Sequence, residues 1–345
     1  MDRTGQQIGN YRLIHLLGSG GFADVYIAEH IYIKKQTAIK ILKGPLSSAD
    51  QNSFILEAQI VENLKHPNII PLIDFGLDSN GSPYLIMEYI PKGTLRNIYP
   101  KGTKVPLSKV AIYVQQLAEA LQYAHDHKFI HRDLKPENVL LDFKDQVFLS
   151  DFGISTIRHN TMSLPQHPTA YSGTPAYSAL EQINGQPRPE SDQYSLAIIA
   201  YELLTGEQPF KGNPVSILFQ QATAIPRKPT HINPNIPTSV ETAILKALQK
   251  DYRQRYRAIK DFAEALCQTP QKYGDTTVVR YYYPRLMKTL EKGEVVENIR
   301  WSKDNKFLNI VFTSSPSITI AVITGEIVRT TTFEANKFKQ ELRSG

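Results

Sequence analysis

Two short segments in the middle of the chain contain side chains of the types that phosphoryl transfer requires. The first, His131–Asn138, reads His-Arg-Asp-Leu-Lys-Pro-Glu-Asn, and the second, Asp-Phe-Gly, occupies residues 151–153. Phosphoryl transfer needs a carboxylate beside the attacking hydroxyl, oxygen ligands for a divalent cation, and cations that balance the phosphoryl charge. The matching groups are Asp133, Lys135, Asn138 and Asp151. The two segments therefore predict a site for phosphoryl transfer.

A glycine-rich stretch near the N-terminus is suited to bring backbone N–H groups close to phosphate oxygens. Gly18, Gly20 and Gly21 lack the side chains that would keep an anion away. Alone this is weak support, because many turns contain several glycines. Lys40 strengthens it, since a lysine in an otherwise apolar strand pattern needs an anionic partner. Glu57 could hold that ammonium in line with a nucleotide, although simple solvation of Glu57 is the alternative.

The elements that must position these residues are mainly strands in the first ninety residues. Alternating apolar residues predict strands at 11–17 and 25–28, which form a hairpin around the glycine-rich turn. The other elements predicted in this part are a strand at 36–42, a helix at 48–64, and strands at 69–76 and 84–89.

Beyond residues 91–94 the pattern changes from strand-rich to helix-rich, which predicts a boundary between two lobes. Helices are expected at 107–127, 190–204, 215–222, 239–249 and 258–266. After a linker at 268–274, strands are expected at 276–283, 297–301, 307–312, 318–323 and 326–332. The predicted fold class is thus α+β, with a β-rich N-lobe, an α-rich C-lobe and a small β-rich C-terminal extension.

Composition and charge argue against several other classes of protein. The chain has 345 residues, 41% hydrophobic and 21% charged, as expected for a globular protein and not for a disordered one. Its net charge of +6 forms no dense basic block, so no nucleic-acid partner is expected. The single cysteine, Cys267, fits a reducing compartment, and neither a membrane span nor a signal peptide is apparent. A cytoplasmic location is therefore expected.

These motifs, taken together, resemble the signature set of the protein kinase family in order and spacing. The resemblance covers about residues 8–267, with the N-lobe at about 8–90 and the C-lobe at about 91–267. Residues 275–345 are left as a small β-rich accessory unit of unknown role. Because Lys135 follows Asp133 by two residues, the chain more narrowly resembles a bacterial serine/threonine kinase of the eukaryotic type.

The resemblance implies a non-specific serine/threonine protein kinase that uses ATP and Mg²⁺, acts in signalling, and has Ser/Thr-containing proteins as substrates. Asp133 would be the catalytic base, Lys135 would neutralise phosphoryl charge, and Thr174 would help to hold Asp133 and the incoming hydroxyl. Asn138, which is also catalytic, and Asp151 would bind Mg²⁺. The residues that would bind or cover ATP are Leu17, Gly18, Ser19, Gly20, Gly21, Phe22, Ala23, Asp24, Val25, Ala38, Lys40, Glu57, Met87, Glu88 and Leu140.

Three more residues would have structural roles in such a kinase. Glu181 and Arg255 would form the ion pair that anchors the substrate-binding segment, and Asp192 would brace the catalytic loop. The chain departs from the family pattern at Ala23, Leu180, Ala197 and Tyr252, where glycine, proline, glycine and proline are usual. None of these is a phosphate or metal ligand, but Leu180 puts in doubt how the substrate-binding segment is fixed.

Arg132, beside the catalytic base, suggests that phosphorylation orders the segment after residue 151, because an arginine there can pair with a phosphate. Thr169 is the preferred site, and self-association for autophosphorylation would follow from it. An ordinary group of hydroxyls in a mobile loop is the alternative. The rival sites are Thr161, Ser163, Tyr171 and Ser172.

Two other functions stay open, as does the role of the tail. A pseudokinase that serves as a scaffold would be favoured if Leu180 and the other departures prevent activity. A small-molecule phosphotransferase would lack a peptide-binding segment of the kind that residues 173–181 resemble. Residues 299–326 faintly resemble one blade of a β-propeller, which cannot close a propeller by itself. The tail is therefore expected either to dock on the kinase lobe or to recruit a substrate.

Overall fold

The computed structural model describes residues 2–44, 46–152 and 175–267, together with the strands that follow residue 271. The chain divides into two compact units, Met1–Thr269 and Pro270–Gly345, and each is described by itself. Within the described ranges, no helix has both the length and the apolar character that crossing a membrane requires.

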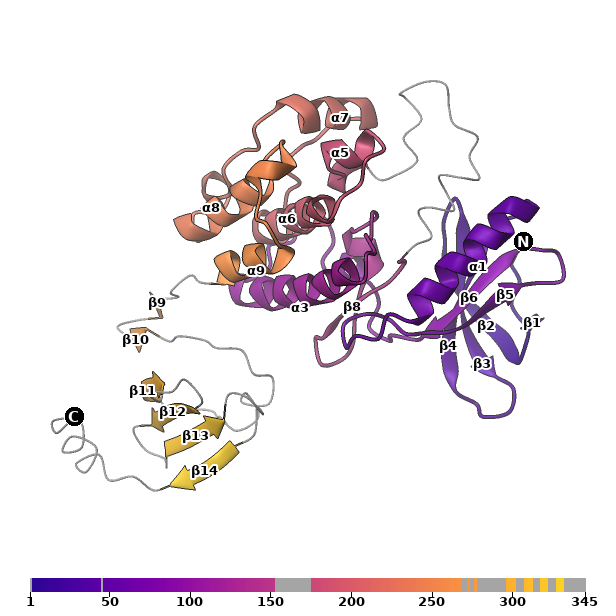
Figure 1. Ribbon diagram of the computed structural model, residues 1–345, viewed down its shortest axis with the longest axis horizontal. Helices are drawn as coiled ribbons and strands as arrows, with labels where there is room; N and C mark the ends of the chain where they lie inside the picture. The colour runs from indigo at the N-terminus through magenta and orange to yellow at the C-terminus, as the bar shows by residue number, and fades with distance from the viewer. Residues whose placement is uncertain are drawn as a thin grey trace. The chain divides into compact units, whose positions relative to one another are not determined.

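The first unit begins with a six-stranded antiparallel sheet, the N-lobe, in the order β1-β2-β3-β4-β6-β5 (Figure 1). Helix α1 follows β4 and packs Phe54 and Ala58 against Leu72 and Leu85 of the sheet. These elements are β1 Gln7–Ile8, β2 Tyr11–Ser19, β3 Ala23–His30, β4 Gln36–Leu42, α1 Ser48–Glu62, β5 Leu72–Leu77 and β6 Pro83–Glu88.

The N-lobe differs from the sequence prediction mainly at the ends of its elements. β4 has the predicted bounds, but α1 ends at Glu62 because the N–H of Asn63 already bonds back to the Ile60 carbonyl. β5 begins at Leu72 and not at residue 69, because Ile69 forms an isolated bridge with Leu149 of the other lobe. A tertiary contact thus replaces what local pattern predicted as the start of a strand.

The C-lobe is helical and is built around α6. Residues 191–205 of this helix are all buried, as expected for a helix that is enclosed on every side. Gly206, with a φ of 78°, ends the helix in the left-handed conformation that glycine tolerates. The elements are α2 Leu95–Ile98, α3 Leu107–Asp126, η1 Pro136–Asn138, β7 Val139–Leu141, β8 Val147–Leu149, η2 Pro175–Tyr177, α5 Leu180–Ile183, α6 Pro189–Thr205, α7 Pro214–Thr223, η3 Pro229–His231, α8 Thr238–Ala247, η4 Tyr252–Gln254 and α9 Ile259–Cys267.

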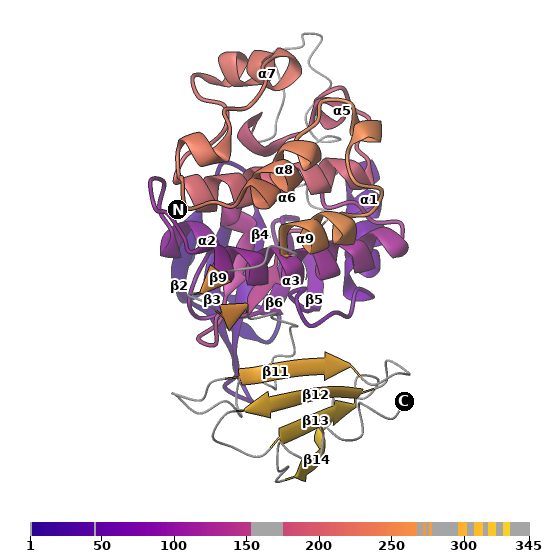
Figure 2. The ribbon, with the colours of Figure 1, turned by 90° about the vertical axis from the view of Figure 1, so that its left-hand side faces the viewer.

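The second unit contains a small strand pair and a four-stranded antiparallel meander, β11-β12-β13-β14 (Figure 2). Ile299, Ile310 and Ile318 stand opposite one another across neighbouring strands. Arg300, Asn309, Thr319 and Arg329 form the adjacent row. The strands are β9 Lys272–Tyr273, β10 Thr276–Thr277, β11 Val296–Trp301, β12 Phe307–Phe312, β13 Ser317–Ala321 and β14 Ile327–Thr331.

The predicted α+β class, with a β-rich N-lobe, an α-rich C-lobe and a β-rich extension, is confirmed. β9 lies within the stretch predicted as a linker, and the strand expected at 276–283 is described only over its first two residues.

Candidate active site

The loop that leads from α3 to β7 is shaped by one buried carboxylate of α6. Asp192 accepts the backbone N–H groups of His131, at 2.9 Å, and Arg132, at 3.0 Å. It also bonds to His125 Nε2 at 2.8 Å. Burial alone would raise the pKa of Asp192, but the hydrogen bond and charge of His125, together with His131, hold the pKa below its ordinary value. Asp192 therefore lies where the resemblance places the brace of the catalytic loop.

The carboxylate of Asp133 is held by two residues of the same loop. Lys135 Nζ lies 2.8 and 3.0 Å from its two oxygens, and Asn138 Nδ2 donates to Oδ2 at 3.1 Å. Asn138 Nδ2 also lies 2.7 Å from the backbone oxygen of Asp133, which closes the loop. The loop thus brings together three of the predicted site residues, with the Asp133 side chain 12% exposed.

The second predicted segment joins this loop through backbone hydrogen bonds. Ser150 donates its N–H to the Asn138 carbonyl at 2.9 Å, and its own carbonyl lies 2.8 Å from His131 Nε2. Asp151 follows with a φ of 65°, a conformation that residues with a Cβ rarely adopt. The ring of Phe152 packs edge-on against His131, with centroids 4.7 Å apart. Asn138 and Asp151 are therefore close in space, although Asn138 ends η1, just before β7, and Asp151 comes after β8.

Asn138 and Asp151 suit a divalent cation by the chemistry of their oxygens. Among the described contacts, Asn138 donates through Nδ2, which leaves Oδ1 as the atom that can face a cation. The Asp151 side chain is 20% exposed and so is within reach of a ligand. Mg²⁺ is typically held by one or two protein oxygens together with phosphate and water oxygens. The residues present fit such an ion.

Lys40, at the centre of the N-lobe sheet, reaches across to the C-lobe segment. Its Nζ lies 2.7 Å from Asp151 Oδ1, and its side chain is only 6% exposed. Glu57, Met87 and Asp151 line one mostly apolar cavity beneath α1. The ion pair between Lys40 and Glu57 stays a prediction, because the pair that the structure gives Lys40 is with Asp151.

The glycine-rich turn links β2 and β3 and is largely exposed. Leu17 and Phe22 are both exposed, and the Gly20 N–H bonds to the Ala23 carbonyl at 2.9 Å. Ala23 is the buried first residue of β3 and packs into the N-lobe core. The added methyl group of this departure from the family pattern therefore has a packing partner.

A small polar cluster ties the glycine-rich turn to β4. Ser19 Oγ donates to Asp24 at 2.6 Å, and Lys43 Nζ lies 3.0 Å from the same carboxylate and 2.7 Å from the Gly20 carbonyl. Burial would raise the pKa of Asp24, but the bonds from Ser19 and Lys43 lower it overall. Lys43 was not predicted as a site residue, because its neighbours in the sequence reveal nothing of this tertiary contact.

Four more of the residues predicted to bind or cover ATP lie on strands of two different sheets. Ala38 pairs with Met87, and Thr37 pairs with Glu88, across β4 and β6. Leu140, on β7, forms a bridge with Thr94. Ala38, Met87 and Glu88 are thus on two paired strands of the N-lobe, and Leu140 is on the first strand after the catalytic loop.

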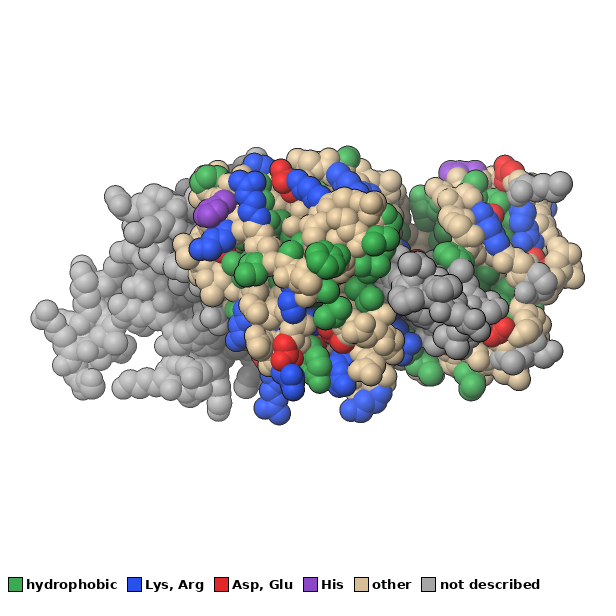
Figure 3. Space-filling model, turned by 90° about the horizontal axis from the view of Figure 1, so that it is seen from above, with side chains coloured by type: hydrophobic (Ala, Val, Ile, Leu, Met, Phe, Trp, Pro, Cys, Tyr) green, Lys and Arg blue, Asp and Glu red, His purple; other side chains and the backbone are tan. Residues whose placement is uncertain are grey.

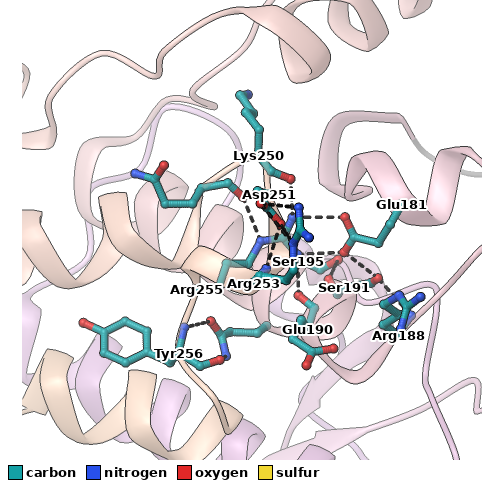
Figure 4. Close-up of polar contacts among 12 residues, drawn as sticks. Glu181, Arg188, Glu190, Ser191, Ser195, Lys250, Asp251, Arg253, Arg255 and Tyr256 are labelled. Carbon is teal, nitrogen blue, oxygen red and sulfur yellow. Dashed lines mark hydrogen bonds and ion pairs between the residues drawn. The ribbon is translucent and has the colours of Figure 1, made fainter.

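Behind the site, Arg255 binds the segment that opens α5 (Figure 4). Its Nη1 and Nη2 lie 2.7 and 3.1 Å from the two carboxylate oxygens of Glu181, and both side chains are buried. Ser191 Oγ donates to the same carboxylate at 2.7 Å, and Arg255 also donates to the backbone carbonyl of Glu190. Bidentate geometry and full hydrogen bonding are what a buried ion pair needs.

Three of the departures from the family pattern have defined surroundings here. Leu180 opens α5 directly after Ala179, so the Glu181 anchor forms without a proline at this position. Ala197 is fully buried in α6, and Tyr252 stacks on the guanidinium of Arg188 at 4.6 Å. The predicted positions that lie outside the described residues are Thr161, Ser163, Thr169, Tyr171, Ser172, Gly173 and Thr174.

Sequence reasoning missed several partners of the predicted residues. His125 forms a hydrogen bond with the buried carboxylate of Asp192, and Ser191 forms one with that of Glu181. Gln182 Nε2 donates to the Arg132 carbonyl at 2.7 Å. The polar residues of α6, which interrupt an otherwise apolar helix, were the signal that could have found Ser191.

Comparison with known proteins agrees with this geometry. The model of the protein kinase domain matches residues 11–270, about three quarters of the chain. Serine/threonine-protein kinase PrkC of Bacillus subtilis is 36% identical over 259 residues, which cover 73% of this chain and 39% of PrkC.

Two mycobacterial relatives are similar to a comparable degree. Serine/threonine-protein kinase PknB of Mycobacterium leprae is 35% identical over 72% of this chain and 41% of its own length. Serine/threonine-protein kinase PknF of Mycobacterium tuberculosis is 34% identical over 81% of this chain and 60% of its own length. The chain thus spans about two fifths of the length of the first curated relatives that it matches.

Proposed function

Because the chain belongs to the protein kinase family, we propose that it transfers the γ-phosphoryl group of ATP to serine and threonine hydroxyls of proteins. The observation that carries this proposal is the meeting of Asp133, Lys135 and Asn138 in one hydrogen-bonded loop beside Asp151. A carboxylate, a cation and oxygens suited to a metal ion are therefore close together, and this supports the proposal over the pseudokinase alternative.

In the proposed reaction, Asp133 accepts a hydrogen bond from the substrate hydroxyl and orients its oxygen toward the γ-phosphorus. As the new O–P bond forms, the bond to the ADP oxygen breaks, and the hydroxyl proton passes to an Asp133 carboxylate oxygen. Lys135 Nζ, which already lies 2.8 Å from that carboxylate, balances the negative charge of the phosphoryl oxygens. Lys40 would pair with the phosphates once ATP replaces its present partner, Asp151.

Asn138 and Asp151 would hold Mg²⁺, which would supply positive charge against the phosphate oxygens when bound. The cation would also give Asp151 a new partner in place of Lys40. This exchange explains how one carboxylate can pair with a lysine without ATP and serve as a metal ligand with it.

Proteins with exposed Ser or Thr are the proposed substrates, with the chain itself among them. Thr169 is the preferred autophosphorylation site, and transfer between two copies is the proposed route. On the face that Figure 3 shows, the described Lys and Arg side chains are scattered among other residues, and the absence of a nucleic-acid partner stays a prediction. Cytoplasmic location also stays a prediction.

The test is transfer of radiolabelled phosphate from Mg·ATP onto the whole chain and onto a generic basic protein, with phosphosites mapped by mass spectrometry. Label on Ser or Thr that disappears in Asp133→Ala is the expected result. Mixing active chain with a shorter, tagged Asp133→Ala chain shows whether label passes between copies. Binding of Mg·ATP without any transfer above the Asp133→Ala background would contradict the proposal and favour a scaffold.

A further inference from the structure

The ammonium group of Lys250, shortly after α8, faces a ring and a backbone carbonyl. Its Nζ lies 4.2 Å from the centre of the buried Phe210 ring and 3.4 Å from the backbone oxygen of Gln220, in the last turn of α7. Among the residues that the structure describes, no carboxylate pairs with Lys250. The next residue, Asp251, binds Arg253 instead, at 2.9 Å. The positive charge of Lys250 therefore has only weak partners.

The lysines of the active site differ from Lys250 in what lies beside them. The side chains of Lys40 and Lys135 are 6% and 15% exposed, and their Nζ atoms lie 2.7 and 2.8 Å from carboxylate oxygens. Lys250 is also partly buried, but the charge beside it is a second cation, Arg255, which donates to the Lys250 backbone oxygen at 3.2 Å. Figure 4 shows the Lys250 side chain pointing away from the ion pair of Arg255 with Glu181.

These surroundings favour the neutral amine of Lys250. Burial, and then the positive charge of Arg255, lower the pKa of Lys250 to about 8. An ordinary lysine has a pKa of about 10.4, so a much larger fraction of Lys250 is neutral near pH 7.4. Only the neutral amine has a lone pair for bond formation, and desolvation or a neighbouring cation activates a lysine as a nucleophile. The proposed phosphoryl transfer makes no use of this nucleophile.

We propose that Lys250 is a site of covalent acylation, at which its amine takes the acyl group of a small acyl phosphate. The neutral Nζ attacks the carbonyl carbon of the donor and forms a C–N bond. The C–O bond to the phosphate breaks, the phosphate leaves with the bonding electrons, and the nitrogen releases one proton to water. The product is a neutral amide, so the reaction removes the positive charge that faces the last turn of α7.

The test treats the full chain with a limiting amount of acetyl phosphate, from about pH 6.5 to about pH 9.5. Quantitative mass spectrometry at early times gives the rate of acetylation at each lysine. Lys246, on α8, is the matched control, because its Nζ lies over the Tyr256 ring at the same 4.2 Å but its side chain is exposed. The same labelling of Lys250→Arg verifies the assignment of the modified peptide.

At about pH 7.4, we expect Lys250 to react about tenfold faster than Lys246. The larger neutral fraction should outweigh the lower nucleophilicity of a less basic amine. The rate at Lys250 should level off above about pH 8, whereas an ordinary lysine gains neutral amine up to about pH 10. In guanidinium chloride, where the fold is lost, the rates at the two lysines should agree within about twofold.

Three results would overturn the proposal. The first is equal rates at Lys250 and Lys246 in the folded chain. The second is a preference for Lys250 that persists in guanidinium chloride, because it would then come from the local sequence and not from the fold. The third is a rate at Lys250 that still rises at about pH 9.5. None of these measurements involves ATP, so the acylation site and the proposed phosphoryl transfer are tested separately.

Discussion

The catalytic loop and the glycine-rich turn face the same site but are held in different ways. The loop is fixed from behind by buried groups, above all by Asp192, whose carboxylate binds two backbone N–H groups and His125. The turn has exposed Leu17 and Phe22 and is tied down by an exposed lysine, Lys43. The catalytic loop, which would hold the protein hydroxyl, is thus preorganised by buried groups. The glycine-rich turn, which would cover ATP, is held mainly by contacts at the surface.

This difference teaches where mutations should matter for folding and where they should matter for ligand binding. We call the buried carboxylates of Asp192 and Glu181, with their hydrogen-bond partners, the buried frame. Changes to this frame should lower the free energy of unfolding and thereby reduce activity. Changes to the turn should leave the fold intact and alter the affinity for ATP.

The largest effect is expected for Arg255→Met, which leaves the buried carboxylate of Glu181 without its cation. Breaking such a pair should lower the free energy of unfolding by about 3 to 5 kcal/mol. Chemical denaturation measures this loss. Arg253→Met is the matched control: its side chain is 75% exposed and pairs with Asp251, so the loss should stay below about 1 kcal/mol. Similar losses in both variants would contradict a buried frame.

Asp192→Asn should lower the free energy of unfolding by about 1 to 3 kcal/mol, because an amide cannot accept all the hydrogen bonds of the carboxylate. The folded pKa of Asp192 is below the ordinary value of 3.8, so the charge stabilises the fold above about pH 4. That stability is lost as the pH falls through the folded pKa.

Urea denaturation from pH 7 down to pH 3 should therefore show wild type and Asp192→Asn converging below about pH 4. Asp126→Asn, at the exposed end of α3, should follow wild type throughout. If the difference in free energy of unfolding between wild type and Asp192→Asn stays constant down to pH 3, the charge of Asp192 contributes nothing to stability.

A non-hydrolysable ATP analogue with Mg²⁺ should protect the two sides of the site unequally. We expect hydrogen–deuterium exchange of the amides at 20–22 to slow by about tenfold or more, since these residues form the exposed turn between β2 and β3. Exchange at the amides of 131, 132, 133 and 138 should change little, because these four N–H groups already donate hydrogen bonds within the catalytic loop or to Asp192. Equal protection of both segments would contradict the view that the catalytic loop is more constrained than the glycine-rich turn.

The smallest effect is expected for Lys43→Ala, which removes the tether of the glycine-rich turn. An exposed ion pair is worth about 1 kcal/mol or less, so KM for ATP should rise by no more than about fivefold, at unchanged kcat. Lys34→Ala removes an exposed pair with Glu29, outside the glycine-rich turn, and should change neither quantity. An unchanged KM in Lys43→Ala would show that the turn needs no tether.

The sequence predicted the parts of the site that are local in the chain. Asp133, Lys135 and Asn138 lie within six residues of one another, so their types and spacing indicated a common loop. The partners that were missed, such as His125 for Asp192, come from elements that only tertiary packing brings together. The same reason accounts for β5, whose first predicted residue, Ile69, instead forms a bridge with Leu149 of β8.

Arg132 and Asp151 both have left-handed backbone, with φ of 66° and 65°. In terms of mutational tolerance, each position therefore has two separate requirements, one on charge and one on backbone conformation. Asparagine at 151 suits the backbone but loses the charge, whereas glutamate keeps the charge but adopts this conformation less readily. A substitution table based on chemical likeness would rank the glutamate exchange as mild. In a saturation library, these two positions should accept fewer residues than their chemistry alone would allow.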